Sequence, residues 1–593
     1  MTEVVVVVGS GSIGQAIARQ GRARNHVLLA ALLAVLGCSR AEPPVPAGRA
    51  EGGVRVLRSA TVVTSDSAMV VSASPYATNA GLAVLRDGGN AVDAAVAVAF
   101  TLAVTYPTAG NIGGGGFLVA RINGQNVALD FREKAPGSAS RDMYLDSTGQ
   151  LTDRSLTGAL AAGVPGSVAG LFEAHRKYGT KPWAELVQPA VELAERGFVV
   201  DTAFSEDSEE ATARLAKDSA SAALFLRDGR FVAPGTRWRA PELAAVLRRI
   251  AEKGRDGFYA GETAASIVAA MQKSGGIISR ADLAGYTPVW RSPVEFEYRG
   301  HHVVSMPPAS SGGLTLALIL GIVEGRDVAS LGWRTGASIH LLAEAERRAF
   351  ARRNALLGDP EFGPVATAAF LSKDTAAALR AEITDRASEG SSAPAAPEPR
   401  HTTHFSIVDA RGNAVALTTT LNESYGAAFT VPGAQFLLND EMDDFTTKPG
   451  AVNAMGLVQG ERNAIAPGKR MLSSMTPTLV LDSAGAIELV TGAAGGAYII
   501  TGVAHQIVSL LDFHKSLGEA MAAPQFHFQD QPDSLVVEKV AWADTAVMLM
   551  APLGHAVKRS PWGLLVSMQS IHREAGKWSG VSEPRGFGSA RGY

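Results

Sequence analysis

The most constraining feature of this chain is a low-complexity segment that leads directly into a threonine-headed strand. Ala387–Arg400 (ASEGSSAPAAPEPR) is rich in Ser, Ala and Pro and has no apolar periodicity, so it predicts a mobile linker. His401-Thr402-Thr403-His404 follows at once, and then a run typical of a strand. Taken alone, the two threonines would be ordinary β-formers at a strand start. The linker before them calls for a chemical explanation.

A cut between His401 and Thr402 would supply that explanation. A threonine hydroxyl is a weak nucleophile until a base lies beside it. The freed α-amine of Thr402 titrates near neutrality and could be that base. The cut can be self-made: the Thr402 hydroxyl attacks the His401 carbonyl, the acyl group moves from nitrogen to oxygen, and water hydrolyses the ester. An exposed, strainable linker suits this reaction.

Composition excludes several other classes of protein. The 593 residues include 54 Lys and Arg against 57 Asp and Glu, a net charge of −3. This balance argues against a nucleic-acid partner, which would require a basic surface. Hydrophobic residues make up 46%, so global disorder is excluded. The single Cys excludes an intrachain disulfide framework and a Cys-rich metal site.

Local patterns predict a mixture of hairpins and helices. Asn123-Gly124 is a strong hairpin signal, and no later apolar run reaches the length of a membrane span. Asn90 can cap the helix that follows it. Three hairpins are predicted: Phe117–Ile122 with Val127–Phe131, Phe405–Asp409 with Ala414–Thr420, and Thr478–Leu481 with Ile487–Val490. Helices are predicted over Asn79–Arg86, Ala91–Tyr106 and Trp183–Arg196.

The N-terminus carries two conflicting signals, of which the first is a dinucleotide fingerprint. An apolar run precedes Gly9–Gly14, which matches G-x-G-x-x-G. Such a site needs a second strand and an acidic residue about 20 residues further on, and neither appears. The motif alone suggests an NAD-linked oxidoreductase, a hypothesis that a nicotinamide-binding assay would test.

The second signal is a secretory leader. Arg22 and Arg24 precede the short apolar run Val27–Leu36, and Gly37-Cys38 follows. This ending resembles a bacterial lipobox, in which the cysteine is lipidated, although Leu36 is an unusual residue before the glycine. A plain signal peptide or a buried cysteine are the alternatives.

We therefore expect an exported protein, periplasmic or anchored to the bacterial envelope through a lipid on Cys38. The first two dozen residues are then interpreted as an upstream mis-start of the reading frame. Glu42–Gly53 is rich in Pro, Ala and Gly and is interpreted as a tether. Residues 1–53 are expected to lie outside the fold.

From about Val70 to Gly588 the chain resembles the γ-glutamyltransferases (glutathione hydrolases), which are N-terminal-nucleophile hydrolases. The resemblance is carried by spaced motifs: GGNAVDAAVA (Gly88–Ala97), GNIGGGGF (Gly110–Phe117), DFREKAP (Asp130–Pro136), MPPASSGG (Met306–Gly313), TTHFSIVDARGNAVALTTTLN (Thr402–Asn422), LNDEMDDF (Leu438–Phe445), LSSMTPT (Leu472–Thr478) and TGAAGG (Thr491–Gly496). It implies an α/β (α+β) fold, a four-layer αββα sandwich. It also implies autoprocessing into a large subunit, 54–401, and a small subunit, 402–593, interleaved as one heterodimer.

The resemblance implies a receptor for both charges of the glutamyl group. Arg132 would clamp the α-carboxylate, since a guanidinium fork grips a carboxylate bidentately. Ser473 and Ser474 would donate hydroxyl hydrogen bonds to it. The ammonium would be bound by Asn422, Glu441 and Asp444. The two acids are three residues apart, so one helical turn or a tight loop could aim both at one cation. Without the resemblance, Arg132 would suggest a surface ion pair and the two serines would suggest turn residues. Glu441 and Asp444 would suggest a solvated acidic turn.

Further residues would serve the acyl transfer itself. Thr420 would orient Thr402 through a hydrogen bond. Gly495 and Gly496 could present backbone N–H groups to an oxyanion, since neither has a Cβ; the alternative is a plain turn. Gly113–Gly116 lacks the Lys-Ser/Thr of a phosphate loop, so close backbone packing near Arg132 is expected instead.

The implied reaction is γ-glutamyl acyl transfer. Thr402 attacks the γ-amide of glutathione or another γ-glutamyl compound and releases the amine. Water, an amino acid or a dipeptide then takes the acyl group. No metal and no organic cofactor are required.

Three stretches depart from the family pattern. In the loop Gly450–Lys469, expected to be a lid, Met455 stands where many bacterial relatives have an aromatic residue. This leaves the balance between water and an acceptor amine open, because a lid governs solvent access. The departures in Ala349–Asp359 and Phe526–Gln529 are expected to be structural.

Two alternatives remain from the sequence. A cephalosporin (glutaryl) acylase on the same scaffold would keep the nucleophile and Arg132 but lose the ammonium receptor. An unprocessed, non-enzymatic surface binding protein would remain one intact chain.

Overall fold

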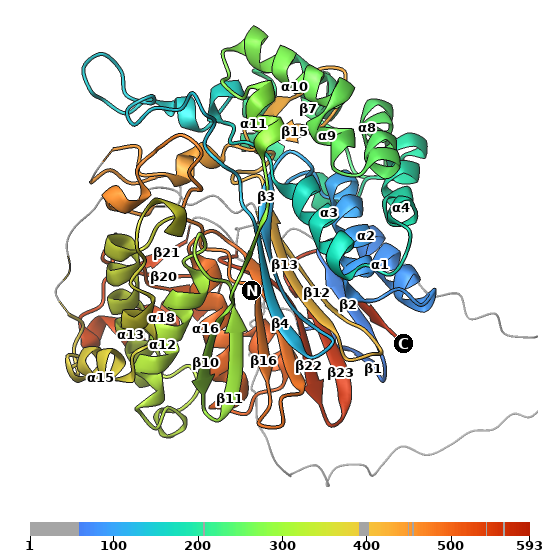
Figure 1. Ribbon diagram of the computed structural model, residues 1–593. Helices are drawn as coiled ribbons and strands as arrows, with labels where there is room; N and C mark the ends of the chain where they lie inside the picture. Colours follow the sequence, from blue (N-terminus) through green and yellow to red (C-terminus); the bar gives the residue numbers. More distant parts are fainter. Residues whose placement is uncertain are drawn as a thin grey trace, which may run out of the picture. The chain divides into compact units, whose positions relative to one another are not determined.

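Two β-sheets stacked face to face form the centre of the computed structural model (Figure 1). The structure describes residues 59–205, 208–388, 390, 402–448, 450–453, 456–540, 542–560 and 564–593. All of these belong to one compact unit, Ala50–Tyr593. The dinucleotide-like motif, Cys38, the tether, most of the linker, His401 and Met455 lie outside the described residues.

The first sheet has seven strands, all antiparallel to their neighbours, in the order β24-β2-β12-β13-β3-β4-β9. Thr402 is the first residue of β12, an interior strand that lies between β2 and β13. The strands are β24 (Ser589–Gly592), β2 (Met69–Ser72), β12 (Thr402–Val408), β13 (Ala414–Thr420), β3 (Gly115–Ile122), β4 (Gln125–Phe131) and β9 (Val289–Arg291).

The second sheet has the order β1-β23-β22-β17-β16-β11-β10, with β18 also paired to β22. Its strands are β1 (Val63–Ser65), β23 (Lys577–Ser582), β22 (Ser567–Glu574), β17 (Ile487–Thr491), β16 (Thr478–Leu481), β11 (His301–Ser305), β10 (Val294–Tyr298) and β18 (Ala493–Ala494). Strands β12 and β2 of the first sheet pack on β22 of the second.

The first sheet is buried on both faces, because each face is covered. Successive side chains of a strand point to opposite faces. In β2, Val70 joins the hydrophobic cluster on the helix side, whereas Met69 and Val71 join the cluster that includes the second sheet. Because both faces are covered, every residue of β2, β12 and β13 is buried rather than every second one.

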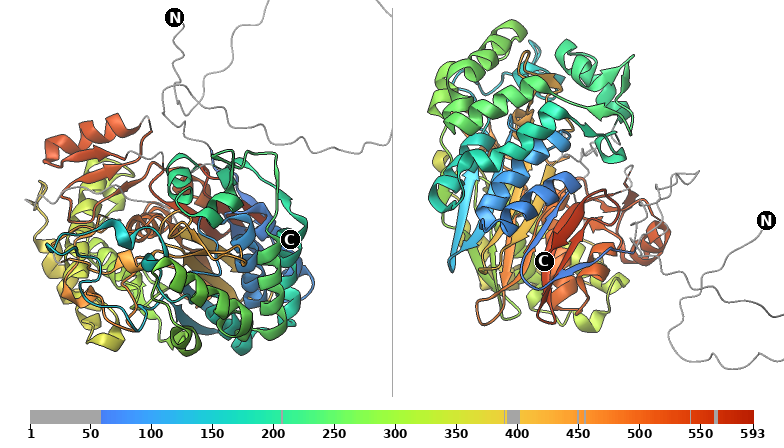
Figure 2. Two further views of the ribbon diagram at one scale, coloured as in Figure 1. Left: turned by 90° about the horizontal axis from the view of Figure 1, so that it is seen from above. Right: turned by 90° about the vertical axis from the view of Figure 1, so that its right-hand side faces the viewer.

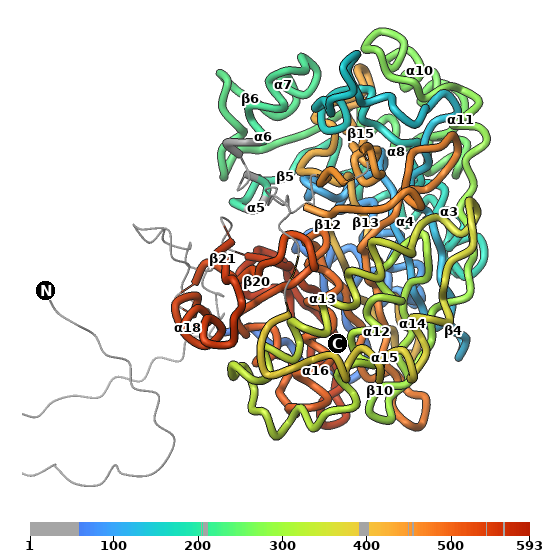
Figure 3. The backbone as a smooth tube through the Cα atoms, turned by 90° about the vertical axis from the view of Figure 1, so that its left-hand side faces the viewer, coloured from blue at the N-terminus to red at the C-terminus, as the bar shows by residue number. Residues whose placement is uncertain are grey.

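Helices cover the outer face of each sheet, which gives the four-layer αββα sandwich and confirms the predicted fold class. On the first sheet lie α1 (Pro75–Arg86), α2 (Ala91–Thr105) and α3 (Ser167–Tyr178), with α4 (Trp183–Arg196) packed on α2; this side faces the viewer in the right-hand view of Figure 2. On the second lie α12 (Gly312–Glu324) and α16 (Tyr498–Leu511), with α13 (Gly336–Leu356) packed on α12 (Figure 3).

Further elements surround this core. The remaining α-helices are α5 (Thr202–Ser205), α6 (Ser208–Leu215), α7 (Ser219–Phe225), α8 (Pro241–Lys253), α9 (Asp256–Tyr259), α10 (Gly261–Ser274), α11 (Arg280–Gly285), α14 (Thr367–Leu371), α15 (Lys373–Ala381), α17 (Leu517–Ala522) and α18 (Trp542–Met550). The remaining strands, in small sheets, are β5 (Phe198–Val199), β6 (Leu226–Arg227), β7 (Arg230–Phe231), β8 (Arg237–Trp238), β14 (Phe429–Thr430), β15 (Leu437–Leu438), β19 (Phe526–His527), β20 (Leu535–Val537) and β21 (Val557–Arg559). Within the described ranges, no helix is both long and apolar enough to span a bilayer.

The predicted hairpins and helices are confirmed, with shifted ends. All three hairpins form as antiparallel pairs. Helix α1 begins at Pro75 rather than Asn79, because Ser74 is extended and proline favours the first helical position. Asn90 caps α2 as expected, and its side chain accepts hydrogen bonds from the backbone N–H groups of Val92 and Asp93.

Both sheets are shared between the parts of the chain before and after Thr402. In the first sheet, β2 from the earlier part lies between β24 and β12 from the later part. In the second, β1 pairs with β23, and β11 pairs with β16. Neither part alone could close these sheets.

Candidate active site

Thr402 is the first residue of the interior strand β12 of the first sheet, directly opposite Thr420 on β13. Its side chain is 7% exposed. The Thr402 Oγ1 donates to Thr420 Oγ1 over 3.4 Å, a long contact for two hydroxyls. Thr420 Oγ1 also accepts from the backbone N–H of Asn422 at 2.8 Å. The predicted orienting contact is therefore present.

Asn422 lines the same cavity as Thr402 and Thr420. Its φ of 79° lies in the left-handed region, which asparagine tolerates better than most residues. Its Nδ2 donates to the backbone carbonyl of Asp440 at 3.1 Å. This bond connects the end of β13 to the turn that carries the acidic residues.

The glycine run beside this strand packs as predicted. A Cβ on Gly114 would lie 2.1 Å from the carbonyl oxygen of Thr420, and one on Gly115 would lie 2.6 Å from that of Phe131, next to Arg132. Asn111 fixes the approach, because its Nδ2 donates to the Thr420 carbonyl at 2.8 Å. Its Oδ1 accepts from the Gly114 N–H at 2.9 Å.

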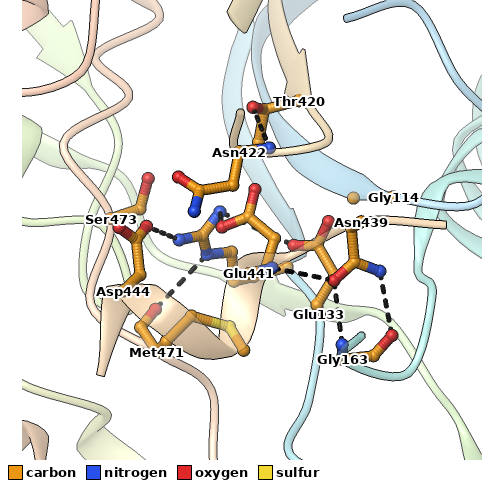
Figure 4. A network of polar contacts seen from close by, with 12 residues as sticks. Gly114, Glu133, Gly163, Thr420, Asn422, Asn439, Glu441, Asp444, Met471 and Ser473 are labelled. Carbon is orange, nitrogen blue, oxygen red and sulfur yellow. Dashed lines mark hydrogen bonds and ion pairs between the residues drawn. The ribbon is translucent and has the colours of Figure 1, made fainter. Parts of the chain in front are cut away.

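Arg132 follows β4 directly and is buried among three carboxylates. These acids, Glu133, Glu441 and Asp444, are labelled in Figure 4. Its Nη1 lies 2.6 Å from Glu441 Oε2 and 3.6 Å from Glu133 Oε2. Its Nη2 donates to Asp444, and its Nε donates to the carbonyl of Met471 at 3.3 Å. The structure thus places the predicted cation and the two predicted acids in direct contact.

Burial and charge act against each other in this cluster. Burial lowers the pKa of Arg132, but the carboxylates of Glu441, Asp444 and Glu133 outweigh it and raise that pKa above its usual value. Burial raises the pKa of Glu441 well above its usual value, against the opposing charge of Arg132. Burial likewise raises the pKa of Glu133 to about 7.

Asn439 holds the acidic turn in place, and it was not predicted from the sequence. Glu441 and Asp444 lie on one 3₁₀ turn, Glu441–Asp444, as their spacing allowed. The Asn439 Oδ1 accepts from the backbone N–H groups of Glu441 and Gly163, and its Nδ2 donates to the carbonyls of Gly113 and Gly163 at 2.9 Å (Figure 4). Asparagine in a polar turn carries no distinctive local signal.

The two predicted serines lie on a loop that faces Asp444. The Ser473 Oγ accepts from the backbone N–H of Met475 at 3.1 Å, and its carbonyl accepts from Ser311 Oγ at 2.6 Å. The Ser474 Oγ accepts from Arg353 Nη2 at 2.9 Å.

Arg353 corrects one expectation from the sequence. It comes from Ala349–Asp359, which was expected to be only structural, yet its side chain lines the same cavity as Thr402. The buried face of α13 brings it there.

Gly495 and Gly496 precede helix α16 and both have positive φ, 140° and 56°. A Cβ on Gly495 would lie 2.6 Å from the carbonyl oxygen of Leu565. Gly496 lines the cavity with Thr402, whereas Gly495 lies one residue behind it.

These groups converge on one open cavity. The predicted residues among its lining are Arg132, Thr402, Thr420, Asn422, Glu441, Asp444, Ser473, Ser474 and Gly496; the others are Arg353, Leu457, Leu472, Met475 and Ile499.

The described part of the expected lid reaches the cavity and is attached to the acidic turn. Leu457 lines the cavity. The side chains of Gln459 and Asn463 donate to the carbonyl of Asp444, at 3.2 and 2.6 Å.

A second cavity, of about 390 Å³, lies beside α16 and shares no lining residue with the first. It contains His505, whose Nε2 lies 2.5 Å from Glu346, and Arg334. It contains none of the predicted residues, so the chemistry is assigned to the cavity at Thr402. Among the residues that the structure describes, no group of three or more His, Cys, Asp or Glu side chains could hold a metal ion.

A threonine at the start of an interior strand of an αββα sandwich is typical of the class of N-terminal-nucleophile hydrolases. The model of the family described as gamma-glutamyltranspeptidase matches residues 77–593. The chain belongs to that family.

Known relatives are similar over most of their length. The chain is 46% identical to the glutathione hydrolase proenzyme of Pseudomonas sp. (strain A14), over 81% of this chain and 84% of the relative. It is 43% identical to the glutathione hydrolase proenzyme of Escherichia coli (strain K12), over 95% and 97%. The crystal structure of cephalosporin acylase from Bacillus halodurans superposes with a TM-score of 0.80 at 27% identity, covering 94% of this chain and 99% of that one.

Proposed function

We propose that this protein is a γ-glutamyl acyltransferase that acts on glutathione and related γ-glutamyl compounds, with Thr402 as its nucleophile. The observation that carries the proposal is the contact between Arg132 and the acids Glu441 and Asp444, in the cavity that Thr402 lines. The names of the relatives support the same activity.

The paired charges suit the zwitterionic end of a glutamyl group. An α-amino acid carries its ammonium and carboxylate on one carbon, so a receptor for both must place a cation beside anions. Arg132 lies 2.6 Å from Glu441. On binding, the substrate carboxylate would pair with Arg132 and its ammonium with Glu441, Asp444 and the Asn422 side chain. The site's own ion pairs would be exchanged for equivalent ones, which limits the cost of burying both charges.

The reaction proceeds in two acyl transfers. After the cut, Thr402 Oγ1 attacks the γ-carbonyl carbon and its proton passes to the free α-amine. The tetrahedral intermediate expels the amine product, which takes that proton, and leaves a γ-glutamyl ester on Thr402. Water or an acceptor amine then attacks the ester by the reverse proton route. The backbone N–H groups at Gly495–Gly496, near the start of α16, would stabilise the oxyanion.

The acceptor is water, an amino acid or a dipeptide. The attachment of the lid to the acidic turn supports a role for this loop in controlling solvent access. Turnover of γ-glutamyl p-nitroanilide with and without the dipeptide glycylglycine would test which acceptor is used. Faster release of p-nitroaniline with the dipeptide, and a γ-glutamyl peptide among the products, would indicate transfer to the dipeptide. An unchanged rate, with glutamate as the sole acyl product, would indicate hydrolysis.

A glutaryl acylase is the second candidate, because the chain superposes on a cephalosporin acylase over most of its length. Release of p-nitroaniline from γ-glutamyl and glutaryl anilides separates the two candidates, since only the first has an ammonium group. We expect the γ-glutamyl anilide to be preferred in kcat/KM by about 100-fold, because the glutaryl group leaves buried carboxylates unpaired. A preference for the glutaryl anilide would support the acylase.

Two variants control this experiment. Thr402→Ala should abolish turnover of both anilides. Thr403→Val is the matched control, because the buried Thr403 hydroxyl has no hydrogen-bond partner among the described residues and valine keeps its shape. Thr403→Val should be processed and active.

The cellular location is a separate proposal, which rests on the sequence around Cys38. Export through the leader and lipidation of Cys38 would place the enzyme in the bacterial envelope. Growth with labelled palmitate should label the protein, and Cys38→Ser should abolish the label. A mature protein that retains Met1 would contradict this.

A further inference from the structure

Arg353 is a fully buried cation whose acceptors are all neutral. It lies near the end of α13, is 0% exposed and lines the cavity. Its Nε donates to Ser311 Oγ at 2.9 Å and its Nη2 to Ser474 Oγ at 2.9 Å. Its Nη1 donates to Asn354 Oδ1 at 2.8 Å and, over 3.4 Å, to Gln459 Oε1. Within the described ranges, no carboxylate oxygen lies within 4.0 Å of it.

This guanidinium fixes the direction of the hydrogen bond at Ser474. An arginine side chain has donors and no acceptor, so the Ser474 oxygen must accept. The hydroxyl hydrogen of Ser474 then remains available for an acceptor in the cavity. A substrate carboxylate is such an acceptor.

The same cation supports Ser473 through Ser311. Ser311 accepts from Arg353 and donates to the carbonyl of Ser473 at 2.6 Å. Ser473 Oγ in turn accepts from the backbone N–H of Met475. Both serines thus accept a hydrogen bond from the protein, and both can donate to a ligand.

The distribution of charge in the cavity also favours a carboxylate near Ser474. Arg132 is surrounded by Glu441, Asp444 and Glu133, whereas Arg353 has no acid at ion-pair distance. Burial lowers the pKa of Arg353 to about 10, so it remains charged at neutral pH. The Asp444 carboxylate opposes this lowering from beyond ion-pair distance, so the side of the cavity at Ser474 carries a positive charge that no described acid contacts directly, which favours a bound carboxylate.

We propose that Arg353 is a positioning residue for the α-carboxylate of the donor substrate, holding Ser474 and, through Ser311, Ser473 as hydroxyl donors. The inference rests on the proposed γ-glutamyl activity. Arg353 acts through the serines and is not itself a reacting group.

Two donors that differ only in the α-carboxylate test this. γ-Glutamyl p-nitroanilide has the group, and 4-aminobutanoyl p-nitroanilide lacks it. For Arg353→Met we expect kcat/KM for the γ-glutamyl anilide to fall about 10- to 100-fold, mainly through KM, because hydrogen bonds to a charged group are lost. For the 4-aminobutanoyl anilide we expect a change below about 3-fold. If the wild type does not turn over the second anilide, its inhibition constant replaces kcat/KM.

Matched variants keep the result interpretable. Arg352→Met, at the neighbouring and only half-buried position, should leave kcat/KM unchanged for both anilides. Ser474→Ala should reproduce part of the selective loss, and Arg353→Met should cost less in the Ser474→Ala background than in the wild type, since the two share the contact at Ser474 while Arg353 also supports Ser473 through Ser311. If Arg353→Met does not fold, Ser474→Ala and Arg353→Lys carry the test.

An equal loss on both substrates, or no loss on either, would overturn the proposal for Arg353. Failure of the wild type to cleave the γ-glutamyl anilide would instead overturn the proposed function. The two failures are therefore distinguishable.

Discussion

At the scale of single residues, the Arg132 guanidinium contacts Glu441 and Asp444 through different nitrogens. A lysine ammonium is a single point charge and cannot hold two carboxylates apart while receiving a third bidentately. We expect Arg132→Lys to lower kcat/KM for the γ-glutamyl anilide by at least about 100-fold, as for a broken buried charge contact. Arg141→Lys, which changes a partly exposed pair with Glu461, is the control and should leave the rate unchanged. A loss below about 3-fold in Arg132→Lys would contradict the assigned role.

Glu133 gives the site a pH dependence of stability. Burial raises its pKa from 4.5 to about 7, although Arg132 opposes the rise. An acid whose pKa is higher in the folded state favours folding at low pH, and this contribution is lost as the pH rises from about 4.5 to about 7. The loss is at most about 3 kcal/mol in the free energy of unfolding.

Urea unfolding at pH 5 and pH 8 measures this effect, in the Thr402→Ala background so that a single chain unfolds. The free energy of unfolding should fall more between these pH values with Glu133 than with Glu133→Gln. Equal falls in both proteins would mean that Glu133 is ionised in the folded state throughout this range.

At the scale of elements, the glycine run positions the strand end that carries Thr420. A Cβ on Gly114 would lie 2.1 Å from the Thr420 carbonyl, so Gly114→Ala must displace backbone. We expect a loss of about 1–3 kcal/mol in the free energy of unfolding and a lower kcat. In Gly285→Ala the new Cβ meets nothing within 4 Å, and no loss is expected. Equal stability of the two variants, measured by thermal unfolding, would show that this close approach is unimportant.

Much of this level could be predicted from sequence. The Asn123-Gly124 turn, the strands around it and the Asn90 cap depend on neighbours in the chain, and these predictions are confirmed. The start of α1 at Pro75 was missed, because the proline was not interpreted as a residue of the first helical turn.

The site was predictable only where motifs marked it. Arg132, Glu441 and Asp444 were placed together by family resemblance, and the structure brings them into contact. Asn439 and Arg353 were missed, because their importance comes from partners far apart in sequence. Arg353 and Ser474 are 121 residues apart, and they meet only when helix α13 packs over the loop that precedes β16.

At the scale of the whole molecule, both sheets contain strands from before and after Thr402. Separating the two parts would expose sheet edges and the cores on both faces. We expect the cut protein to elute as one species in gel filtration and to separate only in denaturant. Elution of two separate fragments under native conditions would contradict the shared-sheet account.

The central claim is that Thr402 becomes the N-terminal nucleophile. Intact-mass measurement of the purified protein beside Thr402→Ala tests it most directly. The account predicts two fragments in the wild type, one ending at His401 and one beginning at Thr402, and an uncut junction in Thr402→Ala. An active wild type that remains one chain, or a Thr402→Ala variant cut at the same bond, would contradict it.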